Sequence, residues 1–351
     1  MIKDIGVYSD NNNNKIRLNS NESPVELKKD KFNYLKYTLE NIELNRYPDS
    51  NSDALREAYS KYAEVKKENI IAGNGSDEML NLVISKNISK GDKILTLSTD
   101  FVMYDFYTNI NEGEVIKYNL DLDKGFNIDD FINLALVNDV KIILFSNPNN
   151  PTGYGFTIKD IRKILNTFKD KVVLVDEAYY EFYGESVISL INEYKNLLVT
   201  RTLSKAWGLA ALRIGFLIGN EELIEELSKY KTPYNISSLS QEIAKIYLED
   251  SKELLNNIKI IISERERLYK VLKEVEEEVF NKYKEYKIKV YNSKGNFIYG
   301  KTTIKDKLIK SLEEEDIKIR YFQDNSFRIT IGLEEENTKV SKAIKKVFLF
   351  S

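Results

Sequence analysis

The chain has 351 residues, with 52 basic and 55 acidic side chains and a formal net charge of -3, a balance that gives no electrostatic reason to expect binding to nucleic acid or to an anionic membrane. It contains no cysteine and no histidine, which excludes disulfides, thiolate nucleophiles, the serine-histidine triad and the usual zinc sites, so we expect no bound metal. Any acid-base chemistry must therefore use Lys, Tyr, Asp or Glu.

The first residues lack a basic region followed by an apolar run, and no apolar stretch reaches the length of a membrane span. We therefore expect a cytoplasmic protein. Residues 1–30 are polar, with an unbroken run of asparagine at 11–14, and are predicted to form an arm with little structure of its own. A proline turn at residues 45–49 contains Tyr47, and a helical pattern extends from Ala54 to about Val65.

From about residue 70 to residue 220, short apolar runs alternate with amphipathic segments. This alternation predicts a mainly parallel sheet covered by helices on both faces, in which ligand sites lie beyond the carboxyl ends of the strands. The predicted strands are Ile70–Ala72, Lys93–Leu97, Glu114–Tyr118, Lys141–Phe145, Lys171–Val175 and Leu197–Thr200. Beyond residue 221, long charged helices and a second group of strands predict a separate, smaller α+β domain. Its predicted strands are Ile288–Tyr291, Asn296–Tyr299, Ile317–Tyr321 and Phe327–Ile331.

Candidate binding residues follow the ends of the first and second strands. Gly75, Ser76 and Asp77 open a helix whose free N–H groups suit a phosphate, although helix capping accounts equally well for Ser76 or Asp77. Phe101 and Tyr104 stand where an aromatic ring can lie on a planar ligand, although core packing is the commoner role of such residues.

Two more candidate clusters follow later strands of the same series. The segment 146–153 contains two prolines and several amides, including Asn150, and is typical of an extended loop with fixed side-chain directions. Asp176 and Tyr179 are three residues apart, so that an acid and a phenol share one side of a helical turn.

The last predicted strand of the large region leads to Lys205. Thr202, Ser204 and Arg213 add two hydroxyls and a second cation within a short span, which suits an anionic ligand such as a phosphate group. Burial and a neighbouring like charge both lower the pKa of a lysine, and the neutral amine can attack an aldehyde. From this stretch alone, an ordinary solvated lysine beside a strand end is an equally good interpretation.

Taken together, these segments resemble the fold-type-I aminotransferases that use pyridoxal phosphate, and within them the histidinol-phosphate aminotransferase family. The resemblance covers about residues 17–332 and is carried by Leu18-Asn-Ser-Asn-Glu22, Asn45-Arg-Tyr-Pro48, Asn147-Pro-Asn-Asn-Pro-Thr-Gly153, Val175-Asp-Glu-Ala-Tyr179, Arg201-Thr-Leu-Ser-Lys205, Arg320-Tyr-Phe322 and Arg328-Ile-Thr-Ile-Gly332. It implies an α/β fold, with a mainly parallel sheet between helices in a large cofactor-binding domain at 31–235. The N-terminal arm, 1–30, would associate with a small α+β domain at 236–351.

The resemblance also implies the reaction and the partners. The substrates would be a small amino donor and a keto acid, and the reaction would interconvert histidinol phosphate plus 2-oxoglutarate with imidazole acetol phosphate plus glutamate, in histidine biosynthesis. The enzyme would be a homodimer with shared active sites, in which Tyr47 reaches the cofactor phosphate of the partner subunit.

Each remaining candidate residue receives a role from the same resemblance. Lys205, Asp176 and Tyr179 would be catalytic: Lys205 would hold the cofactor covalently and then carry a proton, and Asp176 would keep the ring nitrogen protonated. The residues implied to bind the cofactor are Gly75, Ser76, Asp77, Phe101, Asn150, Asp176, Tyr179, Thr202, Ser204, Lys205 and Arg213. Those implied to bind the substrate are Arg320, Arg328 and Asn21, with the two arginines gripping its anionic groups.

Three other activities are open at this point. A threonine-phosphate decarboxylase would share the cofactor residues and the arginine pair, but it usually has a His-Gly-Gly segment, and this chain has no histidine. An aminotransferase for free aromatic amino acids would need one carboxylate grip instead of two arginines. A regulator that uses an idle pyridoxal-phosphate domain as a sensor would carry a helix-turn-helix module, for which the sequence has no basic recognition helix.

Overall fold

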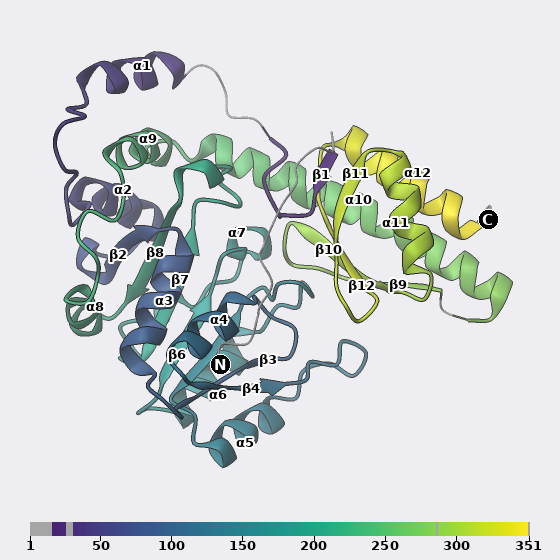
Figure 1. Cartoon of the computed structure of the whole chain (residues 1–351), viewed down its shortest axis with the longest axis horizontal. Coiled ribbons are helices and arrows are strands. Elements are labelled where there is room, and N and C mark those ends of the chain that lie inside the picture. Colours follow the sequence, from purple (N-terminus) through teal and green to yellow (C-terminus); the bar gives the residue numbers. More distant parts are fainter. Residues whose placement is uncertain (1–15, 26–30, 286, 350–351) are drawn as a thin grey trace.

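The computed structural model describes residues 16–25, 31–285 and 287–349. Its larger part is built on a seven-stranded sheet with the order β2-β8-β7-β6-β5-β3-β4 (Figure 1). The strands are β2 (Ile70–Asn74), β3 (Lys93–Leu97), β4 (Glu114–Tyr118), β5 (Ile142–Ser146), β6 (Val172–Asp176), β7 (Leu197–Thr202) and β8 (Ile214–Gly219). Strands β4, β3, β5, β6 and β7 pair parallel to one another, and β8 pairs antiparallel with both β7 and β2. The prediction of a mainly parallel sheet is confirmed.

Helices cover both faces of this sheet because alternate residues of each strand point to opposite sides. In β5, Ile142 and Leu144 pack in one apolar cluster, and Ile143 and Phe145 pack in the other. The first cluster includes α3 (Ser76–Asn87), α4 (Met103–Ile110) and α8 (Glu221–Ser228), and the second includes α2 (Asp53–Ala63), α5 (Ile128–Asn138), α6 (Ile158–Thr167) and α7 (Tyr180–Tyr183).

Strand β8 is absent from the predicted strands, and its glycines explain both the omission and its position. Gly215 and Gly219 interrupt the apolar run that a strand prediction relies on. A Cβ on Gly215 would lie 2.2 Å from the backbone nitrogen of Ser76, so only glycine lets β8 pass this close to the turn before α3. The glycine thus allows the start of α3 to sit against the sheet, at the site described below.

A second, five-stranded sheet has the order β1-β11-β12-β10-β9 (Figure 1). Its strands are β1 (Ile16–Leu18), β9 (Ile288–Tyr291), β10 (Phe297–Thr302), β11 (Ile317–Tyr321) and β12 (Ser326–Thr330). Its helices are α10 (Lys252–Tyr283), α11 (Lys305–Glu314) and α12 (Glu334–Leu349), and α12 packs against both of the others.

The N-terminal arm contributes to this second sheet. Strand β1 pairs parallel with β11, and the side chains of Ile16 and Leu18 are buried in the core. The prediction of an arm with little structure is therefore wrong for residues 16–18, because pairing with a strand that is distant in sequence supplies the backbone hydrogen bonds that the arm cannot make alone. Residues 1–15 and 26–30 of the predicted arm lie outside the described residues.

Two further helices pack against each other, one before α2 in the chain and one after α8. The helix α1 (Phe32–Asn41) was not predicted, and it packs against α9 (Ser238–Leu248). The helix α9 also packs against α2, so it lies with the larger sheet although it follows residue 235. Within the described part of the chain, no helix is both long and apolar enough to cross a membrane.

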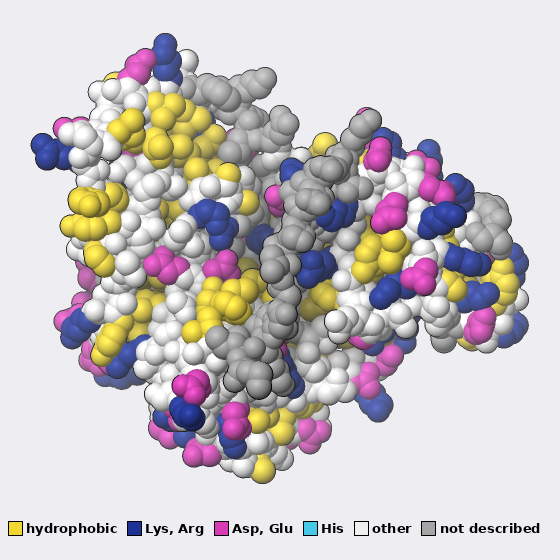
Figure 2. Space-filling model, in the orientation of Figure 1, with side chains coloured by type: hydrophobic (Ala, Val, Ile, Leu, Met, Phe, Trp, Pro, Cys, Tyr) yellow, Lys and Arg dark blue, Asp and Glu magenta, His cyan; other side chains and the backbone are white. Residues whose placement is uncertain are grey.

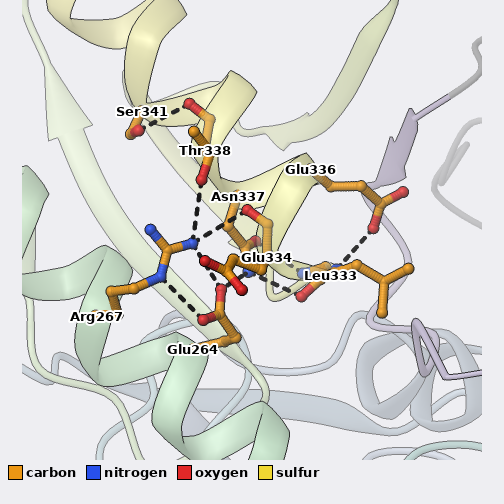
Figure 3. Close-up of polar contacts among 9 residues, drawn as sticks. Glu264, Arg267, Leu333, Glu334, Glu336, Asn337, Thr338 and Ser341 are labelled. Atoms are coloured by element: carbon orange, nitrogen blue, oxygen red, sulfur yellow. Dashed lines mark hydrogen bonds and ion pairs between the residues drawn. The ribbon is translucent and has the colours of Figure 1, made fainter.

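A polar cluster fixes the end of β12 to α10 and α12 (Figure 3). The side chain of Asn337 is fully buried; its Nδ2 donates to the Gly332 carbonyl at 2.8 Å and to Glu264 at 2.9 Å, and its Oδ1 accepts from the Gly332 N–H at 2.9 Å. Arg267 donates to Glu264 and to the backbone at the start of α12. Because Arg328 is four residues before Gly332, this cluster also holds the strand that presents Arg328.

Candidate active site

A cavity lies beyond the carboxyl ends of β5, β6 and β7, next to the start of α3. This is the expected position of a ligand site in an α/β sheet. The cavity is lined by Ser76, Asp77, Phe101, Ser146, Asn150, Asp176, Ala178, Tyr179, Thr202, Ser204, Lys205 and Arg213. All of these except Ser146 and Ala178 are residues that the sequence analysis assigns to the cofactor, and the fold brings them together from segments far apart in sequence.

Asp176 is the buried carboxylate of the cavity, at the end of β6. Its Oδ2 accepts a hydrogen bond from the Tyr104 hydroxyl at 2.7 Å, and its Oδ1 accepts from the Thr200 hydroxyl at 3.0 Å and from the Ala178 N–H at 3.2 Å. Burial raises the pKa of Asp176 to about 6, while the hydrogen bonds from Tyr104 and Thr200 oppose the rise. At neutral pH the group is mainly ionised, and it can stabilise a cationic ring nitrogen.

Lys205 extends into the same cavity from the turn after β7. Its Nζ donates to the Ser20 carbonyl at 2.9 Å and lies 5.8 Å from the centroid of the Tyr179 ring. Burial, and then the charge of Arg328, lower the pKa of Lys205 to about 8. The structure therefore favours a nucleophilic amine over the ordinary solvated lysine that the sequence left open.

Hydroxyls and a guanidinium gather at the end of the cavity next to α3. Arg213 is in the left-handed backbone region with φ 53°, and its side chain donates to Ser204 at 3.4 Å and pairs with Asp77 at 3.1 Å. The Thr202 hydroxyl donates to the Ser204 hydroxyl at 3.0 Å. These donors suit an anion with several oxygens, such as a phosphate monoester.

The backbone at the start of α3 completes this cradle. Gly75 is the N-cap of α3, and no side chain caps the helix, so capping does not explain Ser76 or Asp77. The first N–H groups of α3 and the positive end of its dipole favour an anion there. Gly75 has φ +81°, and a Cβ on it would lie 2.7 Å from the Arg213 guanidinium, in space that the cradle needs.

The N-terminal arm crosses the site through Asn21, which is 1% exposed. Its Nδ2 donates to the Tyr179 hydroxyl at 3.0 Å, and its backbone N–H donates to the Thr330 hydroxyl at 3.0 Å. The Nδ2 of Asn296 donates to the Asn21 carbonyl at 3.1 Å. Asn21, which the sequence predicts to bind the substrate, thus connects the Tyr179 phenol, which follows β6 of the seven-stranded sheet, to β12 of the five-stranded sheet.

Two predicted substrate residues stand opposite each other on neighbouring strands, since Arg320 of β11 is in register with Arg328 of β12. Arg328 donates to the Asn150 side chain and, at 2.6 Å, to the Asn19 carbonyl. Arg328 therefore reaches the cavity residues, whereas Arg320 does not line the cavity. Tyr47 also lies outside it: its side chain is 82% exposed and stacks on Tyr234 with ring centroids 4.7 Å apart.

The contact between Tyr104 and Asp176 was missed by the sequence analysis. The sequence contains one signal for Tyr104, which is its position three residues after Phe101, so that both aromatic residues follow the end of the same strand. Thr200 gave no signal, since it reads as one more residue of a buried strand.

Comparisons with known proteins show which proteins this chain resembles in sequence and in fold. The family model described as "Aminotransferase class I and II" matches residues 13–344. The chain is 40% identical over 335 residues to histidinol-phosphate aminotransferase of Clostridium novyi, with 94% of this chain and 91% of that protein covered. The crystal structure of the histidinol-phosphate aminotransferase from Clostridium acetobutylicum superposes with a TM-score of 0.84 at 26% identity, over 96% of this chain and all of that one. The enzyme of the same name from Sinorhizobium meliloti, solved in complex with pyridoxal-5'-phosphate, has the same fold, with a TM-score of 0.83 at 18% identity over 95% and 91% of the two chains.

Proposed function

Since the chain belongs to the aminotransferase class I and II family and uses pyridoxal phosphate, we propose that it transfers the amino group of histidinol phosphate to 2-oxoglutarate. The products would be imidazole acetol phosphate and glutamate, in histidine biosynthesis. The observation that carries the proposal is the identity to histidinol-phosphate aminotransferase of Clostridium novyi, which extends over nearly the whole of both proteins.

The chemistry of the cavity supports binding of pyridoxal phosphate at each of its functional groups. When bound, this cofactor supplies an aldehyde that reacts with amines and a ring that accepts electron density from the substrate. The cradle formed by Thr202, Ser204, Arg213 and the start of α3 would hold the phosphate. Phe101 would lie against the ring face.

Lys205 would carry the covalent attachment and the proton transfer. Its pKa of about 8 leaves a substantial fraction of neutral amine near neutral pH, so it can attack an aldehyde. When a substrate amine takes its place, the free Lys205 amine would accept the proton of the substrate carbon and would then donate this proton to a carbon of the cofactor. The Ser20 carbonyl, which accepts from Nζ at 2.9 Å, would orient the amine between these events.

Three residues would set the electronic state of the bound ring. The Asp176 carboxylate would pair with the ring nitrogen and keep it protonated, which an ionised and buried group does best. The Tyr179 hydroxyl and the Asn150 side chain would hydrogen-bond the ring oxygen. Arg328 donates to Asn150, so the residue that grips the substrate also contacts a residue that touches the ring.

The substrate phosphate would be held by Arg320 and Arg328. A phosphate monoester has three acceptor oxygens and more charge than a carboxylate, so it can use two guanidinium groups where a carboxylate needs one. Their register on β11 and β12 supports a shared ligand. Asn21 would close the other side of the substrate site through its contacts to Tyr179 and Thr330.

We propose that the enzyme is a homodimer and that Tyr47 enters the cavity of the partner subunit. In the single chain, α1 and the segment after it expose a group of apolar side chains, which Figure 2 shows as a yellow patch in the region where Figure 1 places α1. The group comprises Tyr34, Tyr37, Leu39, Leu44 and Tyr47. Several exposed apolar side chains on one part of the surface are typical of a protein interface.

The reaction can be tested with the purified protein, histidinol phosphate and 2-oxoglutarate, by measuring glutamate and imidazole acetol phosphate. Parallel reactions contain threonine phosphate, with release of carbon dioxide as the readout, or phenylalanine and tyrosine with the same acceptor. We expect amino transfer from histidinol phosphate to exceed the other activities. Carbon dioxide from threonine phosphate without amino transfer would instead support the decarboxylase reaction, and faster transfer from free aromatic amino acids would refute the phosphorylated substrate.

A further inference from the structure

We propose that Tyr104 is a positioning residue that orients Asp176 and keeps it ionised for contact with the cofactor ring. The inference rests on the function proposed above, because it takes Asp176 as the partner of the ring nitrogen. Tyr104 makes no contact with the cavity itself and would act only through the carboxylate.

Burial, a ring contact and a backbone hydrogen bond hold Tyr104 in position. It lies in the first turn of α4, and its side chain is 0% exposed. Its ring meets that of Phe101 edge to face, with centroids 5.7 Å apart and an interplanar angle of 86°. The Thr108 hydroxyl donates to the Tyr104 carbonyl at 2.8 Å, one turn further along the helix. The phenol hydroxyl therefore reaches Asp176 from a rigid support.

The hydrogen bonds of Asp176 show which oxygen is available to a ligand. A carboxylate offers about four acceptor positions, two on each oxygen. On Oδ1 both are used, by the Thr200 hydroxyl and the Ala178 N–H, whereas Oδ2 has the Tyr104 hydroxyl as its donor. A ring nitrogen would thus share Oδ2 with Tyr104. A donor on that oxygen prevents rotation of the carboxylate and favours its charged form.

The charges around this contact make the donor necessary. Asp77, from the start of α3, and Asp100, from the segment before α4, are acidic, and Asp77 raises the pKa of Asp176. Burial together with Asp176 and Asp100 holds the pKa of the Tyr104 phenol well above its usual range, so Tyr104 stays protonated and keeps the proton that it donates to Asp176. Lys205 and Arg213 line the same cavity, but neither donates a hydrogen bond to Asp176 among the contacts of the described residues.

The test uses Tyr104→Phe, which removes only the hydroxyl, and Tyr59→Phe as a matched control. Tyr59 is also a buried tyrosine, but it packs on Phe216 with ring centroids 3.6 Å apart and does not line the cavity. Each full-length variant, freed of cofactor, is titrated with pyridoxal phosphate across a range of pH. Far-UV circular dichroism of the same samples reports folding.

For Tyr104→Phe we expect roughly 10-fold weaker binding at neutral pH, since a hydrogen bond to a charged buried group is lost. Loss of the donor raises the pKa of Asp176, so binding should decline at a higher pH than in the wild type as the pH is lowered. Tyr59→Phe should bind like the wild type. In an Asp176→Asn background, Tyr104→Phe should add less than about a twofold change, because the partner of the hydroxyl has lost its charge.

A second variant reverses the sign of the effect. Incorporation of 3,5-difluorotyrosine at position 104 keeps the shape of the ring and makes the phenol a stronger donor, so the decline in binding should move to lower pH. An equal effect of Tyr104→Phe and Tyr59→Phe, an undiminished effect in the Asp176→Asn background, or a shift in the same direction for both Tyr104 variants would overturn the inference. Absence of pyridoxal phosphate binding by the wild-type chain would overturn the assignment of the cavity itself, and this inference with it.

Discussion

Replacement of Arg328 by Met should make Lys205 more basic and therefore less reactive at neutral pH. Burial is the larger cause of the lowered pKa of Lys205, and the charge of Arg328 is the next. Methionine keeps much of the length of the arginine side chain but removes the positive charge, so the ammonium form of Lys205 becomes less unfavourable. The pKa of Lys205 should rise from about 8 towards the ordinary value of a lysine.

The size of the effect follows from the fraction of neutral amine. With a pKa of about 8, about one amine in ten is neutral at pH 7, compared with about one in three thousand for a pKa near 10.5. We expect the loss of Arg328 to lower the neutral fraction at pH 7 by roughly 3- to 10-fold, since a tenfold change in that fraction corresponds to a change of about one in the pKa. The neutral fraction of wild-type Lys205 rises with pH through about 8 and then levels off.

The assay is the initial rate at which cofactor-free protein captures pyridoxal, followed by absorbance from pH 6 to pH 10. Pyridoxal lacks the phosphate, which keeps the phosphate cradle out of the measurement. Arg320→Met is the control, because Arg320 is on the neighbouring strand but does not line the cavity that holds Lys205. A wild-type midpoint near 10, or the same midpoint in wild type and Arg328→Met, would refute this explanation of the reactivity of Lys205.

Three further predictions concern the other proposed roles. Borohydride reduction of the holoenzyme should fix the cofactor to the peptide that contains Lys205, and Lys205→Ala should keep cofactor through the phosphate cradle while losing turnover by several orders of magnitude; label on another lysine would contradict this. Mixing Lys205→Ala with Tyr47→Ala should restore activity at one site of the mixed dimer, because that site takes Lys205 and Arg213 from one chain and Tyr47 from the other; no recovery above the activity of Tyr47→Ala alone would argue against a shared active site. Arg320→Ala should weaken the binding of histidinol phosphate by about 2 kcal/mol and the binding of glutamate by less, as measured by single-turnover rates of the two half-reactions. Equal losses for the two substrates would remove the reason to assign Arg320 to a phosphate.

The inner strands of the seven-stranded sheet were predictable because burial on both faces produces continuous apolar runs. The predicted Lys93–Leu97 and Glu114–Tyr118 agree with β3 and β4, while β5 and β6 are displaced by one residue from their predictions. Strand ends depend on where the neighbouring strand stops donating hydrogen bonds, which a single segment does not encode. Strand β1 shows the same limit more strongly, since three residues of a polar arm become a strand only through β11.

The cavity residues were predictable for a related reason. Parallel strands end at one edge of the sheet, so residues that follow several strands must meet there, and Asp176, Tyr179 and Lys205 do. Each segment therefore indicates the edge of the sheet at which its last residues lie. A segment does not indicate which side chains contact one another at that edge, and the pairing of Asp176 with Tyr104 was therefore missed.

For Asn21, the local sequence predicts the chemistry of the side chain, whereas its hydrogen-bond partners depend on the whole fold. Its own segment indicated only an amide in a loop before a proline, which suits many ligands equally well. Its hydrogen-bond partners Tyr179 and Thr330 are 158 and 309 positions away, and both belong to elements whose relative placement depends on the packing of two sheets. A local pattern can identify the chemistry that a side chain offers. Which group receives its hydrogen bond depends on distant packing, so the amide of Asn21 becomes a link between two domains only when both sheets have formed.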